Sequence, residues 1–94
     1  MNIFYLQLKL HLQNANSLKE KRGVLKSMVK RTGQKFNISI VEADFQDVWK
    51  SSLVSLVWLS QNNKLGQQQL EEIRKFISIE YPQLELEEEV LEIL

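Results

Sequence analysis

The stretch FYLQLKLHLQNANSLKEKRGVLKSMVKR (Phe4–Arg31) contains a strand pattern, a turn and a helix start in direct succession. As far as Leu12 every second residue is apolar, which is typical of a strand with one buried face. Polar turn residues follow, and Ser17 with Glu20 three positions later forms the capping box that begins many helices. We therefore expect a strand and then a helix that ends near Gly33. The predicted apolar stripe of this helix consists of Leu18, Leu25, Met28, Val29, Thr32 and Phe36.

Further segments complete the pattern. FNISIVEA (Phe36–Ala43) and SLVSLVWLS (Ser52–Ser60) are short and rich in β-branched residues, which predicts two more strands. QNNK then opens a second helix that Pro82 ends. LELEEEVLEIL (Leu84–Leu94) predicts a fourth strand with a frayed or helical tail. The expected apolar face of the second helix consists of Leu65, Leu70, Ile73, Phe76, Ile77 and Tyr81.

The order β-α-β-β-α-β predicts a single ferredoxin-like α+β domain over residues 1–94. In this fold two helices cover one face of a four-stranded antiparallel sheet and leave the other face bare. Along Ser52–Ser60 the residues on both faces are apolar, Val54, Leu56 and Trp58 on one side and Leu53, Val57 and Leu59 on the other. We therefore expect a second copy of the chain to cover the open face, as a homo-oligomer.

Composition narrows the functional classes. The chain has 44% hydrophobic and 26% charged residues, which is ordinary for a folded protein, and it has no Cys, which excludes disulfides and thiolate chemistry. The first residues lack the basic segment of a signal peptide, and no apolar run approaches the about 20 residues that span a bilayer. We expect a soluble cytoplasmic protein without a membrane partner. The net charge of zero hides an asymmetry, because residues 1–50 carry nine Lys or Arg against four Asp or Glu.

The segment Ser17–Arg31 carries six Lys or Arg in fifteen residues. At about 100° per residue, Arg22, Lys26 and Lys30 fall within about 60° of Lys19 and away from the apolar stripe. Such a ridge suits a phosphate backbone, because each cation that displaces a counterion adds affinity. The alternative is a helix face that is only solvated. Lys21 projects close to the apolar stripe, and we expect it to extend its charged end to water.

Glu42, Asp44 and Asp47 lie close in sequence, with Trp49 beside them. Clustered carboxylates can bind a divalent cation or act as acid and base. Their spacing, however, fits no calcium loop, and no Gly-rich phosphate loop accompanies them. The alternatives are Asp side chains that cap a turn beside an anchoring Trp, or an ion pair between Asp47 and the first helix. We expect no metal and no cofactor.

His11 is the only histidine and has no clear carboxylate neighbour in sequence, which makes it a poor metal or triad candidate. It shares the non-core face of the first strand with Tyr5 and Lys9, where RNA-recognition domains place stacking aromatics. The signature of those domains is absent from Ser52–Ser60, so we favour a partner chain on this face. QNANS is not the phosphate cradle that an acylphosphatase-type enzyme needs.

The segment Ser17–Arg22, followed by Phe36–Asn37, Glu42 and Gln46–Trp49, resembles the YlxP-like family of small bacterial proteins. The resemblance implies a ferredoxin-like fold with no established activity. It also implies a ribosome-linked role, since the family is often encoded beside transcription factors, translation-initiation factors and ribosome-binding factor A. The family pattern tends to have a further basic residue at Gly23, and a small residue followed by a polar one at Asp44-Phe45.

Three functional hypotheses follow. The first is a non-enzymatic interaction protein that binds ribosomal RNA or a ribosome-associated factor through Lys19, Arg22, Lys26 and Lys30. The second is a self-assembling protein-binding scaffold, in which the same ridge meets the acidic segment Glu85–Glu89 of another subunit, or an acidic partner. The third is a small hydrolase that uses Glu42, Asp44 or Asp47, and against it the sequence shows no nucleophile, metal cluster or phosphate loop.

Overall fold

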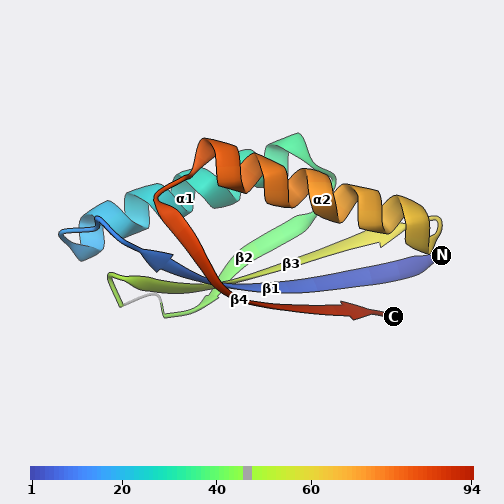
Figure 1. Cartoon of the computed structure of the whole chain (residues 1–94), viewed down its shortest axis with the longest axis horizontal. Helices are drawn as coiled ribbons and strands as arrows, with labels where there is room; N and C mark the ends of the chain where they lie inside the picture. Colours follow the sequence, from blue (N-terminus) through green and yellow to red (C-terminus); the bar gives the residue numbers. More distant parts are fainter. Residues whose placement is uncertain (46–47) are drawn as a thin grey trace.

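The structure is a computed structural model and describes residues 1–45 and 48–94. In chain order its elements are β1 (Asn2–Leu12), α1 (Leu18–Lys35), β2 (Ser39–Asp44), β3 (Ser51–Ser60), α2 (Asn63–Glu80) and β4 (Leu84–Ile93). The strands form one antiparallel sheet in the order β2-β3-β1-β4, and both helices lie on the same face of it (Figure 1). The predicted α+β ferredoxin-like fold is confirmed. Within the described residues, neither helix has the length and apolar character needed to cross a membrane.

The start of α1 follows the predicted capping box with one difference. Ser17 Oγ accepts a hydrogen bond from the Glu20 N–H at 3.1 Å, while the Glu20 carboxylate accepts from the Asn16 N–H, one residue before the cap. The helix continues to Lys35, past the predicted end at Gly33. Gly33 therefore lies within the helix, where it allows a close approach to β2, because a Cβ there would lie 3.3 Å from Ile40 Cγ2.

The helix α2 begins at the cap residue Asn62, whose side-chain oxygen accepts from the Leu65 N–H at 2.9 Å, and ends at Glu80. Leu65, predicted on the buried face, is instead 45% exposed. Its neighbour Gly66 is buried, and a Cβ there would overlap the ring of Phe4. The helix therefore approaches β1 through a glycine, which an apolar-stripe prediction does not detect.

Two strand boundaries also differ from the predictions. β2 begins at Ser39 because Phe36 packs edge-on against Phe76 of α2, with ring centroids 5.8 Å apart. β4 stays extended as far as Ile93, so the predicted frayed or helical tail is wrong. Its end remains a strand because Ile93 pairs with Phe4 in the register of β1 and β4.

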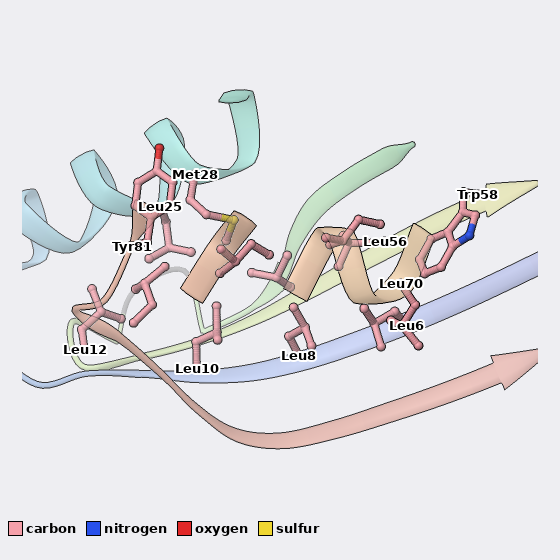
Figure 2. Close-up of a cluster of buried hydrophobic side chains, with 14 of the residues drawn as sticks. Leu6, Leu8, Leu10, Leu12, Leu25, Met28, Leu56, Trp58, Leu70 and Tyr81 are labelled. Carbon is pink, nitrogen blue, oxygen red and sulfur yellow. The ribbon is translucent and has the colours of Figure 1, made fainter. Parts of the chain in front are cut away.

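The core lies between the helices and the β1–β3 centre of the sheet. β1 contributes every even position from Phe4 to Leu12, as its alternation predicts. Its leucines Leu6, Leu8, Leu10 and Leu12 point toward the helices (Figure 2). The Phe4 ring stacks on Trp58 of β3, with centroids 5.3 Å apart. The remaining buried apolar side chains include Leu25 and Met28 of α1, Leu70 and Ile73 of α2, and Val54 and Leu56 of β3.

The opposite face of the sheet has no helix over it (Figure 1). On this open face Leu53 is half-buried, while Val57 is 38% and Leu59 is 62% exposed. Within a single chain, the helices therefore cover the apolar residues on one face of β3, and those on the other face remain partly or largely exposed.

Candidate nucleic-acid interface on α1

The four predicted ridge residues all lie exposed on α1. Lys19, Arg22, Lys26 and Lys30 follow one another at spacings of three or four residues, so they extend over about 16 Å of the helix axis. The buried side of α1 contains Leu25, Met28 and Thr32. The structure therefore brings the four cations together in one line that faces away from the core.

The remaining two cations of the basic block, Lys21 and Arg31, contact groups on other elements of the chain, and of the two only Lys21 is buried. Arg31 donates to Glu80 Oε1 at 2.7 Å and to the Tyr81 hydroxyl at 3.2 Å, and its guanidinium lies over the rings of Phe76 and Tyr81. The hydrogen bond to Glu80, and then that to Tyr81, raises the pKa of Arg31 above its usual value. Arg31 thus joins α1 to the end of α2.

Lys21 is fully buried, so the expectation that its charged end reaches water is wrong. Its Nζ lies 2.6 Å from Glu42 Oε2 and donates to the Phe45 carbonyl at 2.6 Å, while Ser52 Oγ donates to the same carboxylate oxygen. A buried ammonium requires such pairing, because an isolated charge in an apolar interior is strongly disfavoured. Sequence reasoning missed this contact because Glu42 lies on a different element, beneath the helix.

The carboxylates of the predicted loop site do not form one site. Glu42 pairs in register with Val54, whose side chain lies in the core, whereas Asp44 pairs with Leu53 on the open face. Asp47 lies outside the described residues. Trp49 is 45% exposed. Among the described residues no group of three or more His, Cys, Asp or Glu is placed to hold a metal ion.

The turn after β2 has an unusual backbone. Phe45 has φ 63°, in the left-handed region that a bulky side chain rarely adopts. Asp44 Oδ1 accepts from the Phe45 N–H at 2.8 Å, and the Phe45 carbonyl accepts from the Val48 N–H as well as from Lys21. The buried ammonium therefore helps to hold this strained turn against α1.

A groove of about 340 Å³ lies between α1 and β2. Two ridge cations, Arg22 and Lys26, are part of its lining. The other lining residues are Leu25, Val29 and Glu42. No pattern in the sequence indicates this groove, because it depends on how far α1 lies from the edge of the sheet.

The open face has a polar part near His11. The His11 Nδ1 lies 3.6 Å from Glu87 Oε1, and Lys9 Nζ lies 3.8 Å from the other oxygen of this carboxylate. Glu87 sits in β4 where the register with β1 shifts, so the carboxylate neighbour that the sequence did not reveal comes from the far end of the chain. Tyr5 on the same face hydrogen-bonds Ser55 at 3.2 Å.

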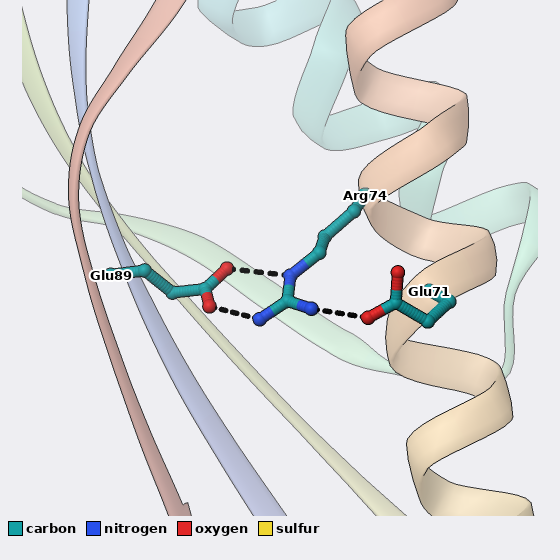
Figure 3. Close-up of polar contacts among 3 residues, drawn as sticks. All are labelled: Glu71, Arg74 and Glu89. Carbon is teal, nitrogen blue, oxygen red and sulfur yellow. Dashed lines mark hydrogen bonds and ion pairs between the residues drawn. The ribbon is translucent and has the colours of Figure 1, made fainter.

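β4 is held to α2 by Arg74. The guanidinium contacts both carboxylate oxygens of Glu89 in β4 and also contacts Glu71 one turn back in α2 (Figure 3). The hydrogen bond to Glu89 is the main reason why the pKa of Arg74 is raised. Part of the acidic segment Glu85–Glu89 is therefore engaged within its own chain.

These features define a small ferredoxin-like α+β protein with one strongly basic helix face. Residues 3–89 match the family described as "Protein of unknown function (DUF503)", and the chain belongs to this family. It is 35% identical over 74 residues to "Uncharacterized protein YlxP" of Bacillus subtilis (strain 168), and the match covers 79% of each chain. The YlxP-like resemblance is confirmed, and neither description assigns an activity.

Proposed function

We propose that this protein is a non-enzymatic RNA-binding protein that associates with ribosomal RNA through Lys19, Arg22, Lys26 and Lys30. The observation that carries the proposal is the exposure of these four cations in one line along α1. A line of cations neutralises successive phosphates and releases their counterions, which gives affinity without requiring contacts to particular bases.

The packing of α1 supports this role. Lys21 fixes the first turns of the helix to β2, and Arg31 fixes its last turns to the end of α2. A helix that is held near both ends presents its exposed cations at fixed spacings, so little order is lost when RNA binds. The contacts of Lys21 and Arg31 therefore support the placement of the four ridge cations.

The test compares two charge reversals of equal size. Lys26→Glu with Lys30→Glu changes the ridge, and Lys64→Glu with Lys75→Glu changes two exposed lysines of α2. We expect the ridge pair to lower affinity for ribosomal subunits by about 10- to 100-fold and to reduce the salt slope by about two. Co-sedimentation at several salt concentrations measures both quantities. Equal losses in the two double variants, or no loss in either, would contradict the proposal.

We also propose that two copies of the chain associate through the open face of the sheet. This association is supported by exposed apolar side chains that lie together on one side of the sheet. They expose roughly 400 Å² per chain, about half of what one partner buries in a standard interface, and the half-buried neighbours add to this. The residues are Ile3, Val41, Val57, Leu59 and Val90.

Light scattering on two matched variants tests the association. Leu59→Glu places a charge on the open face, and Ile79→Glu places one at a similarly exposed position on α2. We expect a dimer for the unchanged protein and for Ile79→Glu, and a monomer for Leu59→Glu. A monomeric unchanged protein at micromolar concentration would exclude this interface.

A further inference from the structure

We propose that the groove between α1 and β2 holds a segment of single-stranded RNA, with one base over its apolar floor and the adjoining phosphates on Arg22 and Lys26. This inference rests on the proposed function, because it assumes that the ridge binds RNA. It goes further in naming the form of RNA and the element, β2, that joins α1 in binding it.

The groove has defined ends. At one end the buried pair Lys21–Glu42 joins α1 to β2, and at the other Gly33 packs against Ile40. Lys21 and Gly33 are about 18 Å apart along the helix axis. Between these two contacts lies the volume of about 340 Å³. This is near the lower limit for ligand pockets, which suits a single nucleotide rather than a duplex.

The lining of the groove separates an apolar floor from a charged rim. Val29 is half-buried and Leu25 is buried, so the apolar surface that the floor offers to an unstacked base comes mainly from Val29. Arg22 and Lys26 are exposed at the rim, and a guanidinium can stack on a base as well as bind phosphate. Glu42 also lines the groove, but its carboxylate is paired with the Lys21 ammonium, so the cations of the rim are the groups that attract phosphate.

The free edge of the sheet supplies hydrogen-bonding groups. Within residues 1–45 and 48–94, β2 pairs with β3 alone, so one side of its backbone has no neighbouring strand. The N–H and C=O groups on such an edge are available to an incoming molecule. The Watson–Crick edge of a base can bind such groups only when the base is unpaired, so this arrangement favours single-stranded RNA.

An extended acidic peptide would also match a cationic rim and a free strand edge. RNA is favoured because the line of cations continues beyond the groove on both sides, to Lys19 and to Lys30. A nucleic-acid strand carries charge along its whole length and can contact all four cations at once. The peptide is therefore an outcome that the experiment must separate.

The experiment measures fluorescence anisotropy with a labelled single strand of about 12 nucleotides and a duplex of the same length. Val29→Gln fills the groove with a neutral polar side chain, and Val24→Gln is the control at another half-buried position of the same helix. We expect the single strand to bind about 10-fold more tightly than the duplex. Val29→Gln should remove this preference without weakening duplex binding, and Val24→Gln should leave both affinities unchanged.

Other outcomes distinguish a failure of the groove inference from a failure of the ridge proposal. Equal affinity for the two RNA forms, with no effect of Val29→Gln, overturns the groove and leaves the ridge proposal intact. No binding of either form overturns both proposals. Displacement of RNA by polyglutamate, together with weaker polyglutamate binding by Val29→Gln, assigns the groove to an acidic peptide and overturns the inference.

A second measurement uses only the unchanged protein and does not depend on the folding of a variant. Addition of the single strand should shift the amide resonances of β2, from Ile40 to Glu42, together with those of α1. Shifts confined to α1 would overturn the inference, because the strand edge would then take no part in binding.

Discussion

Each edge strand of the sheet is joined to a helix by one ion pair, and the two pairs differ in their exposure to water. Lys21 of α1 is 0% exposed where it meets Glu42 of β2, whereas the side chain of Arg74 in α2 is 36% exposed where it meets Glu89 of β4. A buried pair is costly to break because one charge remains without its partner, whereas an exposed pair contributes little and is screened by salt. The same connection between helix and edge strand therefore has a different energetic weight on the two sides.

The largest effect is expected when the buried pair is broken. Lys21→Ala leaves the Glu42 carboxylate and the Phe45 carbonyl without the ammonium, and should lower the free energy of unfolding by about 3 kcal/mol. Urea denaturation measures the change. Lys19→Ala, on the exposed side of the same helix, should change stability by less than about 0.5 kcal/mol.

The double variant Lys21→Met with Glu42→Leu sharpens this result. It removes both charges and keeps similar volumes, so most of the lost stability should return. If Lys21→Ala and Lys19→Ala had equal effects, the distinction between a buried and an exposed cation on α1 would be wrong.

The exposed pair should give a smaller effect that depends on salt. Arg74→Ala should lower the free energy of unfolding by about 1 kcal/mol at low ionic strength, and the difference should shrink in about 1 M salt. The pKa of Arg74 is raised in the folded protein. The stabilisation is therefore fully present at any pH below the usual pKa of arginine, and it is lost only as the pH rises through the raised pKa. Denaturation at both ionic strengths measures the difference. If the loss in the free energy of unfolding did not depend on salt, the Arg74–Glu89 pair would behave like the buried Lys21–Glu42 pair.

Sequence patterns predicted those features of the fold and of the candidate site that depend on local periodicity. The alternation in β1 and the helical spacing of the ridge each follow from neighbours a few residues apart. The partner of Lys21 could not be predicted in the same way, because Glu42 lies on another element and becomes its neighbour only after the chain crosses over. Simple alternation would place Glu42 and Asp44 on the same face of β2, but an irregularity in the register with β3 between them places them opposite Val54 and Leu53, which lie on different faces.

The phase of α2 shows the same limit. Leu65 fits the apolar stripe in sequence, but the ring of Phe4 occupies the space beside the first turn, and only Gly66 leaves room for it. The C-terminal end of β4 is predicted from sequence as a frayed or helical tail, because its glutamates obscure the alternation, and its pairing with β1 is visible only in the structure. Contacts between distant segments therefore decided what local patterns left open.

The turn next to the buried pair gives a third prediction. Phe45→Asn should raise the free energy of unfolding by about 0.7 kcal/mol, because Asn tolerates the left-handed backbone at φ 63°. The ring contact that is lost, with Lys9 Nζ 6.0 Å from the ring centroid, is at the limit of a useful cation–π distance. Thermal and urea denaturation measure the gain.

A double-mutant cycle then relates this turn to Lys21. If the ammonium holds the strained turn in place, the gain from Phe45→Asn should disappear in the Lys21→Ala background, where the turn can relax. The same gain in both backgrounds would indicate that the buried pair does not act on the turn.

The smallest effect is expected at Gly23, which lies among the ridge cations and is exposed, with no atom within 4 Å of an added Cβ. Gly23→Ala and Gly23→Lys should each raise the free energy of unfolding by about 0.5 kcal/mol, because glycine is a poor helix former. Only Gly23→Lys adds a charge, which should increase the salt slope of RNA binding by about one. Equal RNA affinity for the two variants would show that a positive charge at position 23 does not contribute to RNA binding. A larger salt slope for Gly23→Lys alone would show that position 23 belongs to the RNA-binding ridge. The buried Lys21–Glu42 pair is the same in both variants.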